Sequence, residues 1–329
     1  MIDQNSPFVS FCMTSYNQRE YALIALKAAL VQDYPNMEII VADDASTDGS
    51  AKVLQKCAAE SGRDNVHIMT AESNLGRTKN FERLFLAAKG ELIISADGDD
   101  ISEPNRVSRI VEEWVKGGKR ATIIVHDGIK IDPKGRPIGY VGVRSADCPL
   151  GACMAFSPRV VRDFEAATVP GSAQDHVLPR RGLWIGEVLR MNDRLVRYRV
   201  GTGVSSILYR RRRPELQMTG IRIAGYRQNI LDLDYCCRKG MLDASKVEEL
   251  KRSCEEGIRR NAAIAQLISG RTFVERWHAL RTLYPRMLRD RASWLRLPYL
   301  LPEPLADAIY FCYDSAKTAL RLLLYKGKV

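Results

Sequence analysis

Three groups of acidic residues have types and spacings that chemistry could use: Asp43-Asp44, Asp97–Asp100 and Asp175. The densest group, Asp97–Asp100, holds three carboxylates within four residues. These carboxylates repel one another, so the cluster is costly unless a cation binds there. Hard divalent ions such as Mg²⁺ and Mn²⁺ take oxygen ligands and bridge carboxylates to phosphates. We therefore predict a metal–diphosphate site here, against the alternative of a solvated acidic turn.

The other two groups each allow two interpretations. A double aspartate after a strand can accept hydrogen bonds from a nucleobase or a ribose, or Asp44 or Ser46 can simply cap the next helix. Asp175 stands alone in a polar segment, where a surface aspartate or a helix cap is the ordinary expectation. It gains a chemical role only if the fold brings it beside Asp97–Asp100.

Alternating patterns predict the elements that position these groups. Apolar stretches rich in β-branched residues predict strands at 8–14, 38–42, 66–69 and 91–95. Apolar residues three and four positions apart predict helices at 19–32, 50–59, 80–88 and 104–116. Strands that alternate with helices predict a mostly parallel, doubly wound sheet. Ligands bind such sheets at the carboxyl ends of the strands, where the segments from Thr14, Asp43 and Asp97 fall.

The second half of the chain has a different pattern. Residues 121–145 predict short strands with a hairpin turn at 133–135, and residues 164–176 predict a polar loop. From about residue 216 onward the apolar spacing predicts helices. Residues 1–200 contain 26 basic and 26 acidic residues, whereas residues 201–329 contain 24 and 13, so the whole net charge of +11 lies in the last part.

This uneven charge suggests a separate partner for the C-terminal region. One interpretation is a helical accessory domain whose arginines are solvated. A second is docking on an anionic membrane surface, favoured by the aromatic and aliphatic segment 294–301 and worth about 1 kcal/mol per basic residue. Nucleic-acid binding is disfavoured, because no recognisable module is present.

Several classes of protein are excluded or disfavoured. The longest apolar runs are far shorter than the roughly 18 residues of a membrane-spanning helix, and no secretory signal is visible. We therefore expect a cytoplasmic protein, free or peripheral on the cytoplasmic membrane face. The eight cysteines form no Cys-x-x-Cys pair, so they predict reduced core thiols rather than structural zinc. Phosphate-binding P-loop, dinucleotide-binding and serine-hydrolase motifs are absent.

Taken in order, the motifs resemble those of the family 2 glycosyltransferases, which have the GT-A fold. The matching segments are TSYN (14–17), IIVADDASTDGS (39–50), NLG (74–76) with KN (79–80), GELIISADGDD (90–100), GACMAFSPRVV (151–161) and 174–206. The resemblance covers roughly residues 7–213. It implies an α/β fold with a GT-A-type doubly wound mixed sheet in residues 1–213, followed by a basic, mainly α-helical region in residues 214–329.

The resemblance also implies roles for individual residues. Thr14 and Tyr16 would line the nucleotide pocket, Asp44 would hydrogen-bond the base with help from Asp43, and Lys79 would approach the phosphates. Asp97 and Asp99 would form the Asp-x-Asp motif, with Asp99 and Asp100 holding Mn²⁺ or Mg²⁺. Asp175 would be the general base, although Gln174 precedes it where the family usually has glutamate.

Two further differences from the family pattern matter. Many relatives carry a histidine where this chain has Gly201, so its role would pass to Arg199, Arg210 or Arg211. The Gln-x-x-Arg-Trp pattern of processive synthases is absent, which disfavours a polymer synthase.

The expected function is inverting, metal-dependent transfer of a sugar from a nucleoside diphosphate, with a UDP-sugar favoured. The acceptor would be a hydroxyl of a glycan or lipid-linked glycan, in the assembly of surface polysaccharide such as O-antigen or capsule. The alternatives are a non-catalytic nucleotide-sugar-binding scaffold and a sugar-phosphate nucleotidyltransferase. The latter is disfavoured because no glycine-rich, lysine-containing loop follows the first strand.

Overall fold

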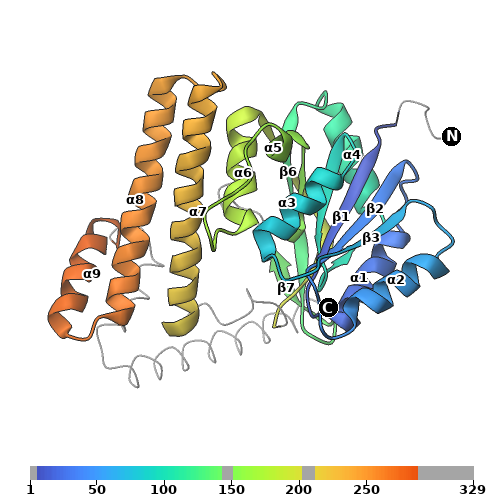
Figure 1. Ribbon diagram of the computed structural model, residues 1–329, viewed down its shortest axis with the longest axis horizontal. Helices are drawn as coiled ribbons and strands as arrows, with labels where there is room; N and C mark the ends of the chain where they lie inside the picture. The colour runs from blue at the N-terminus through green and yellow to red at the C-terminus, as the bar shows by residue number, and fades with distance from the viewer. Residues whose placement is uncertain (1–5, 143–150, 202–211, 288–329) are drawn as a thin grey trace. The chain divides into compact units, whose positions relative to one another are not determined.

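The computed structural model describes residues 6–142, 151–201 and 212–287 (Figure 1). The chain divides into two compact units, one of Met1–Thr168 with Ala173–Gly203 and one of Val169–Ser172 with Val204–Val329. The first unit contains the sheet, and the second contains the helical region. The predicted domain border between residues 213 and 214 remains a prediction, because residues 202–211 lie outside the described part.

A nine-stranded mixed sheet forms the centre of the first unit. Its strands are β1 (Val9–Ser15), β2 (Met37–Asp43), β3 (Val66–Thr70), β4 (Leu92–Asp97), β5 (Ile101–Ser102), β6 (Ala121–Ile131), β7 (Pro137–Val141), β8 (Met154–Phe156) and β9 (Glu187–Arg199). Their order is β3-β2-β1-β4-β8-β6-β9-β5, with β7 also paired to β6. Strands β1 to β4 are parallel to one another, and β8 runs antiparallel between β4 and β6. The prediction of a doubly wound mixed sheet is confirmed.

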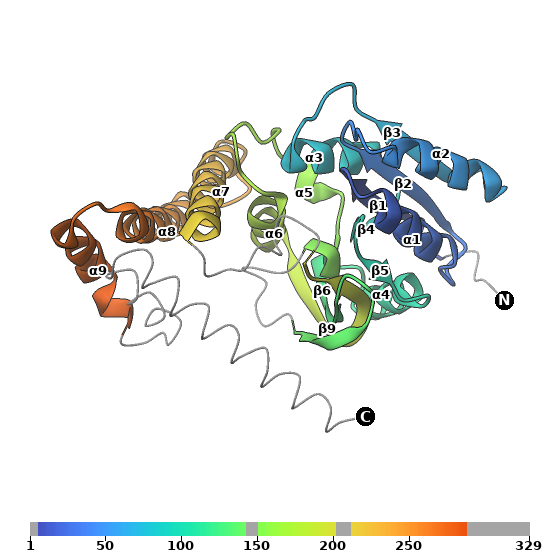
Figure 2. The ribbon, with the colours of Figure 1, turned by 90° about the horizontal axis from the view of Figure 1, so that it is seen from below.

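Helices cover both faces of this sheet. They are α1 (Arg19–Leu30), α2 (Ser50–Glu60), α3 (Arg77–Ala87), α4 (Arg106–Lys116), α5 (Arg159–Arg162) and α6 (Gln174–Ile185). Because side chains alternate along a strand, Phe11 of β1 packs with α1, α2 and α4, whereas the next residue, Cys12, packs with α3, α5 and α6. Figure 2 shows α1 and α3 on opposite sides of β1.

Three elements differ from the sequence-based expectation. The long strand β9, next to the edge strand β5, was not predicted, because its apolar residues do not alternate regularly and four arginines interrupt the pattern. Helix α3 begins at Arg77, three residues before the predicted start. Helix α6 begins at Gln174, so Asp175 lies in the first turn of a helix and not in a loop. The hairpin turn at 133–135 is confirmed between β6 and β7.

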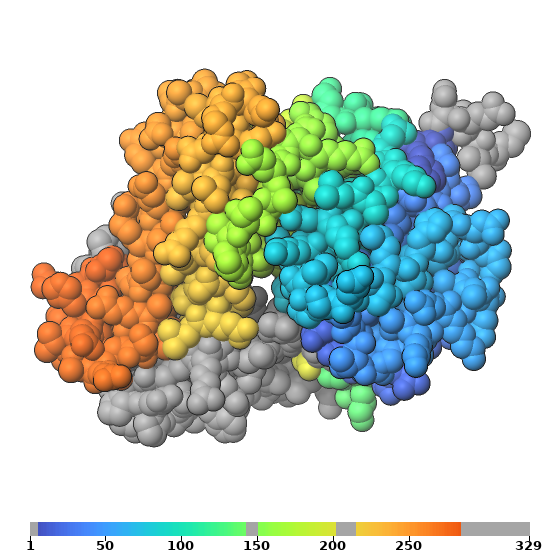
Figure 3. Space-filling view, viewed as in Figure 1, coloured from blue at the N-terminus to red at the C-terminus, as the bar shows by residue number. Residues whose placement is uncertain are grey.

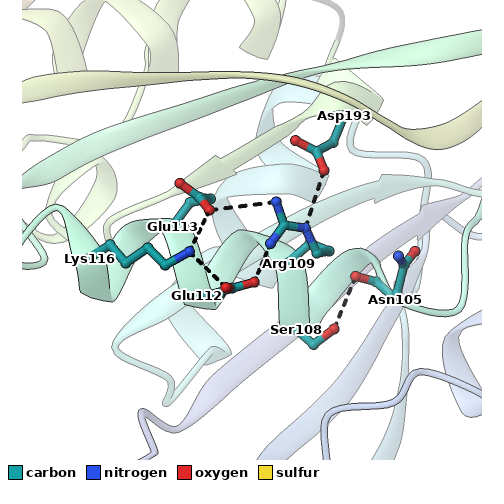
Figure 4. Close-up of polar contacts among 7 residues, drawn as sticks. All are labelled: Asn105, Ser108, Arg109, Glu112, Glu113, Lys116 and Asp193. Carbon is teal, nitrogen blue, oxygen red and sulfur yellow. Dashed lines mark hydrogen bonds and ion pairs between the residues drawn. The ribbon is translucent and has the colours of Figure 1, made fainter.

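The outer face of α4 carries a network of charged side chains (Figure 4). Arg109 donates to Asp193 of β9 at 3.2 Å and also pairs with Glu112 and with Glu113, the latter at 3.5 Å. Lys116 bridges the same two glutamates at 2.7 and 3.1 Å. Exposed pairs of this kind contribute little to stability, and among them Arg109–Asp193 is the pair that joins α4 to β9. The inner face of α4 carries Arg106, which belongs to the site described below.

The second unit is helical in its described part, as the apolar spacing predicted. Helices α7 (Arg212–Arg238) and α8 (Ala244–Ser269) lie side by side, and α9 (Phe273–Met287) packs against α8. The Asp243 side chain caps α8 by accepting a hydrogen bond from the Lys246 N–H. In the segment Val169–Ser172, the backbone N–H of Val169 donates to Gln228 of α7 at 3.0 Å. Across the described residues, every helix is too short or too polar to cross a membrane.

Candidate active site

The parallel register of β1, β2 and β4 brings the predicted nucleotide residues to one edge of the sheet. Thr14 is paired with Asp97, and Ser15 with Asp43. Adjacent strands lie about 4.8 Å apart, so the ends of these three strands form a continuous ledge. Tyr16 follows directly after β1 and is 46% exposed. The coincidence of strand ends expected from the sequence is thus realised.

Side-chain hydrogen bonds join the loop after β1 to the loop after β2 at this ledge. Asn17, in the left-handed region with φ of 50°, accepts a hydrogen bond from the Thr47 N–H at 2.8 Å. Its own N–H donates to Ser46 Oγ at 2.9 Å. The buried carboxylate of Asp43 accepts from the N–H and the hydroxyl of Ser46, at 2.9 and 2.6 Å. Asp43 therefore stabilises the loop after β2 through these two hydrogen bonds.

Asp44 connects this loop to helix α3. One carboxylate oxygen accepts from the Leu75 N–H at 2.8 Å, and the other accepts from the Gly76 N–H at 3.0 Å. The side chain is 4% exposed. Each oxygen keeps a second lone pair, so the predicted contact with a base is compatible with these bonds. Asp44 is not the cap of the helix that follows it, because the residue at that position is Gly49.

The start of α3 presents two cations, Arg77 and Lys79, both exposed. Lys79 was selected from the family resemblance as the group that approaches phosphates. The structure adds Arg77, whose charge is among those that lower the pKa of Asp97. Arg77 was missed because the predicted helix began only at residue 80. Its signal was a basic residue directly after the Asn74–Gly76 motif.

Gly98 separates the carboxylates of the acidic cluster, and the fold leaves no space for a larger residue. A Cβ atom at this position would lie 2.7 Å from the Thr14 carbonyl oxygen and 2.9 Å from Gln18 Oε1. Such distances are well below van der Waals contact. Only glycine allows the turn after β4 to lie this close to the turn after β1.

The acidic cluster itself is strongly perturbed. Burial, followed by the charges of Asp99 and Asp175, raises the pKa of Asp97 to about 7. Asp97 keeps part of its surface exposed, but its carboxyl is desolvated. Burial, followed by the charges of Asp99 and Asp97, also raises the pKa of Asp100 well above its usual value. Asp100 accepts a 2.6 Å hydrogen bond from the Arg199 N–H at Oδ1, while its buried Oδ2 has no partner.

Asp175 reaches the same site from α6. It is one of the charges that raise the pKa of Asp97, so the fold brings these two distant carboxylates together. Its Oδ1 is buried and has no hydrogen-bond partner. A Cβ atom on Gly151 would lie 3.2 Å from that oxygen, so glycine leaves space in front of it. Pro179 lies inside α6 and has no N–H to donate to the Asp175 carbonyl.

A buried arginine that the sequence analysis missed lies behind the cluster. Arg106 is fully buried and donates to the carbonyls of Ser95 and Ala152, both at 2.7 Å. It also donates to Ser102 Oγ at 2.9 Å and to His126 Nε2 at 3.2 Å. Burial lowers the pKa of Arg106 to about 10, so it stays charged at neutral pH. This cation joins the strand that carries Asp97 to the segment that faces Asp175.

A second missed pair ties α6 to α3. Arg181 and Glu82 are both buried, with 3.7 Å between Arg181 Nη1 and Glu82 Oε1. Arg181 also donates to the Glu165 carbonyl at 2.9 Å, and Glu82 accepts from the Ala167 N–H at 2.8 Å. The pair thus holds both helices and the chain between them. Neither residue has a sequence pattern that distinguishes it from surface charges on amphipathic helices.

Arg199 is occupied differently from what the sequence suggested. Its guanidinium donates to the carbonyls of Asp99 at 2.9 Å, Asp132 at 3.1 Å and Pro133 at 2.9 Å. It is buried and stacks over the Tyr21 ring at 4.7 Å. Arg199 therefore holds the backbone of the acidic cluster in place and is a poor substitute for a diphosphate-binding histidine. The other two candidates, at positions 210 and 211, lie outside the described residues.

Within the described residues, no group of three or more His, Cys, Asp or Glu side chains is arranged as a complete metal site. A divalent ion here would therefore need ligands from elsewhere. The cluster fits such an ion, because Asp100 Oδ2 is buried and unpartnered and the carboxylates of Asp97 and Asp99 crowd one another. Mg²⁺ in particular commonly uses one or two carboxylates and completes its shell with phosphate oxygens and water.

Comparison with known proteins agrees with this geometry. Residues 10–147 match the family model described as Glycosyl transferase family 2. The putative colanic acid biosynthesis glycosyl transferase WcaA of Escherichia coli (strain K12) is 33% identical over 105 residues, which is 32% of this chain and 37% of WcaA. The putative teichuronic acid biosynthesis glycosyltransferase TuaG of Bacillus subtilis (strain 168) is 30% identical over 106 residues, 32% of this chain and 41% of TuaG. The chain thus spans about two fifths or less of these relatives.

Solved structures resemble a larger part of the chain. The mannosyltransferase PcManGT from Pyrobaculum calidifontis, in complex with GDP-Man and Mn²⁺, aligns with a TM-score of 0.56 at 15% identity, over 94% of this chain and 88% of that one. At this identity the likeness shows the fold, which is of the GT-A type. The order of the motifs, the geometry of the strand ends and the family match agree, and residues 10–147 therefore belong to glycosyl transferase family 2.

Proposed function

We propose that this chain is an inverting, metal-dependent glycosyltransferase that moves a sugar from a nucleoside diphosphate to a hydroxyl. The observation that carries the proposal is the meeting of two acidic groups from distant parts of the chain. Asp175 of α6 lies within electrostatic reach of Asp97 at the end of β4, and its Oδ1 is unpartnered. One group would serve the leaving diphosphate and the other the attacking hydroxyl.

The reaction has two requirements, and the chain offers a group for each. Asp175 would take the proton of the acceptor hydroxyl as the oxygen attacks the anomeric carbon, and the bond to the diphosphate breaks on the opposite face. The sugar is then joined with inverted configuration, and the proton remains on Asp175. A divalent cation held by Asp99 and Asp100 would supply Lewis-acid stabilisation of the leaving diphosphate. Arg77 and Lys79 at the start of α3 would add positive charge near the phosphates.

Nucleotide recognition would use the ledge at the ends of β1 and β2. Thr14 and Tyr16 would line the pocket, with the exposed Tyr16 ring against the base. Asp44 would accept from the base through its free lone pairs, and Asp43 would support the loop. A UDP-sugar is the favoured donor, supported by fold likeness to TarS of S. aureus, solved with UDP-GlcNAc at a TM-score of 0.54 and 14% identity.

The acceptor would be a glycan or a lipid-linked glycan in surface polysaccharide assembly. The names of WcaA and TuaG, which refer to colanic acid and teichuronic acid biosynthesis, support this class of product. Sugar transfer to a lipid-linked acceptor would place the enzyme at the cytoplasmic face of a membrane, either in solution nearby or bound peripherally.

A thermal-shift screen with UDP, GDP, dTDP and CMP, each with and without Mn²⁺, tests the proposal directly. A ligand at a hundred times its Kd stabilises the native state by about 2.7 kcal/mol, which is readily detected. We expect a Mn²⁺-dependent shift with one nucleotide, followed by slow hydrolysis of the matching donor sugar. Binding without any hydrolysis would indicate a nucleotide-sugar scaffold. Absence of binding to every nucleotide would contradict the proposal.

A further inference from the structure

We propose that the first turn of α9 is a docking surface for an anionic lipid bilayer. Three large apolar side chains are exposed there: Phe273 is 62% exposed, Val274 73% and Trp277 47%. Exposed apolar residues are common singly, but a contiguous group that includes two aromatic rings marks an interaction surface. Figure 3 shows α9, coloured deep orange, at the molecular surface. We call this group, Phe273, Val274 and Trp277, the α9 patch.

The two aromatic rings of the α9 patch form one flat unit. Phe273 and Trp277 are four residues apart, so they lie one above the other on the same side of the helix. Their ring centroids are 6.1 Å apart and their planes differ by 14°. Aromatic rings, tryptophan above all, favour the boundary between lipid headgroups and acyl chains, because one edge can remain wet while the ring is in apolar surroundings.

The turn that presents the α9 patch is held firmly by its own cap. Thr272 Oγ1 accepts from the Glu275 N–H at 3.2 Å, and Glu275 accepts from the N–H groups of Thr272 and Arg271 at 3.2 and 2.8 Å. This reciprocal arrangement is a capping box. Arg276 adds a 2.7 Å hydrogen bond to the Gly270 carbonyl. The exposure of the patch is therefore a property of an ordered helix start and not of a frayed end.

Helix α9 packs against α8 through a set of apolar residues that does not include the α9 patch. Ala279, Leu280 and Leu283 are buried against Leu267 and Ile268 of α8. Since the core contacts of α9 are made by these residues, the α9 patch contributes nothing to that core. Its hydrophobic side chains remain unexplained by the folding of the helical unit.

The positive charge around the α9 patch indicates an anionic partner. Residues 271–287 contain four arginines and one acidic residue, Glu275, whose carboxylate already serves the capping box. Arg271, two residues before this helix, and Arg281 on it are both exposed. A basic fringe around an apolar turn complements an anionic bilayer surface, where the aromatic rings enter the interface and each nearby arginine adds about fivefold in affinity. The earlier membrane candidate, residues 294–301, lies outside the described residues, so the α9 patch is a separate assignment.

The inference deepens the proposed function, because a membrane-bound enzyme would meet a lipid-linked acceptor at high local concentration. It can nevertheless be tested without turnover. The full chain is sedimented with vesicles of phosphatidylcholine, with and without phosphatidylglycerol. The test variant is Phe273→Gln/Trp277→Gln, and the matched control is Leu231→Gln, which alters an exposed apolar residue of α7.

We expect the wild-type chain to bind the phosphatidylglycerol vesicles and the double variant to bind them roughly tenfold more weakly. Arg281→Gln should weaken binding by about fivefold, and Leu231→Gln should bind like wild type. Equal binding by wild type and the double variant, equal binding to both kinds of vesicle, or no binding at all would each overturn the inference. Donor hydrolysis measured without vesicles should be the same in all these proteins, so loss of enzyme function is distinguished from loss of docking.

Discussion

The buried guanidinium of Arg106 donates from Nε to Nε2 of His126 over 3.2 Å. An arginine Nε–H can only donate, so His126 Nε2 must accept, and the imidazole proton lies on Nδ1. Nδ1 in turn donates to the Asp127 carbonyl at 2.9 Å. A neutral histidine of one tautomer thus orients the arginine that joins β4 to the segment before β8. The acidic cluster is built in front of this pair.

Replacing Arg106 tests whether that cation supports the site. Arg106→Met should lower the free energy of unfolding by about 3 kcal/mol or more, because several buried carbonyls lose their donor. Arg109→Met removes a partly exposed arginine, with surface ion pairs only, from the same helix and should leave the urea midpoint close to that of wild type. Urea unfolding of both variants checks this prediction. Equal midpoints for the two variants would contradict the structural importance of Arg106.

His126 should make the protein sensitive to acid. Burial, with the charge of Arg106 next, lowers the pKa of His126 to about 3. The unfolded chain binds this proton near pH 6.5 and the folded chain does not, so stability falls as the pH drops from about 6.5 toward 3, by about 1.4 kcal/mol per pH unit. His126→Gln should lose this dependence when unfolding is measured by urea at pH 7.5 and 5.

The control is His67→Gln, which alters an exposed histidine and should keep the wild-type pH profile. Asp97 and Asp100 act in the opposite direction, because their raised pKa values make the folded state gain stability on acidification. They are present in all three proteins, so the difference between wild type and His126→Gln isolates the histidine. Parallel profiles for those two proteins would show that His126 is not the group responsible.

Asp175→Asn should abolish sugar transfer while nucleotide binding survives. Loss of general-base assistance is expected to slow transfer by about 10²–10⁴-fold. Thermal stability should be retained, because the buried Oδ1 makes no hydrogen bond that the substitution would break. Asp163→Asn, which only breaks an exposed pair with Arg159, is the control and should transfer at the wild-type rate. Transfer by Asp175→Asn at a near wild-type rate would remove Asp175 from the role of base.

Gly98→Ala should damage the nucleotide site through the backbone alone. The added methyl group would lie 2.7 Å from the Thr14 carbonyl, so the turns after β1 and β4 must separate. We expect a loss of about 1–3 kcal/mol in stability and weaker Mn²⁺-dependent nucleotide binding. In Gly117→Ala the new atom would meet only ordinary contacts at 3.5 Å, so this control should bind normally. Calorimetric titration with the nucleotide found in the screen measures the nucleotide affinity of both variants.

The Glu82–Arg181 pair should show strong coupling. Arg181→Met removes the opposite charge beside the buried Glu82 carboxylate, and Glu82→Leu removes the opposite charge beside the buried Arg181 guanidinium, so each single change should cost about 3–5 kcal/mol. The double variant should be more stable than the sum of the two losses predicts. A double-mutant cycle by urea unfolding gives the coupling energy. Strict additivity would mean that the two charges do not stabilise each other.

Some residues of the candidate site could be located from the sequence, and others could not. Strand ends such as Thr14, Asp43 and Asp97 could be located from local apolar patterns, because period and composition identify buried parallel strands. Strand β9 could not be located in this way, since its apolar residues do not alternate regularly and its four arginines interrupt the pattern. Arg77 was lost through an error of three residues in the start of α3. Arg106 and Arg181 were lost because charged residues on amphipathic helices are normally solvated, and nothing local indicates that they are buried.

Local pattern and motif order were sufficient to predict the class of the sheet, the family of residues 10–147 and the acidic groups of the candidate site. These properties depend on residues close together in the chain, where period, turn chemistry and spacing act directly. Other features depend on contacts between residues far apart in the chain. They are the proximity of Asp175 to Asp97, the ion pair of Glu82 with Arg181 and the hydrogen bond from Arg199 to the Asp99 carbonyl. Only the tertiary structure decides them, because burial and electrostatic environment are set by what packs against a residue and not by its neighbours in sequence.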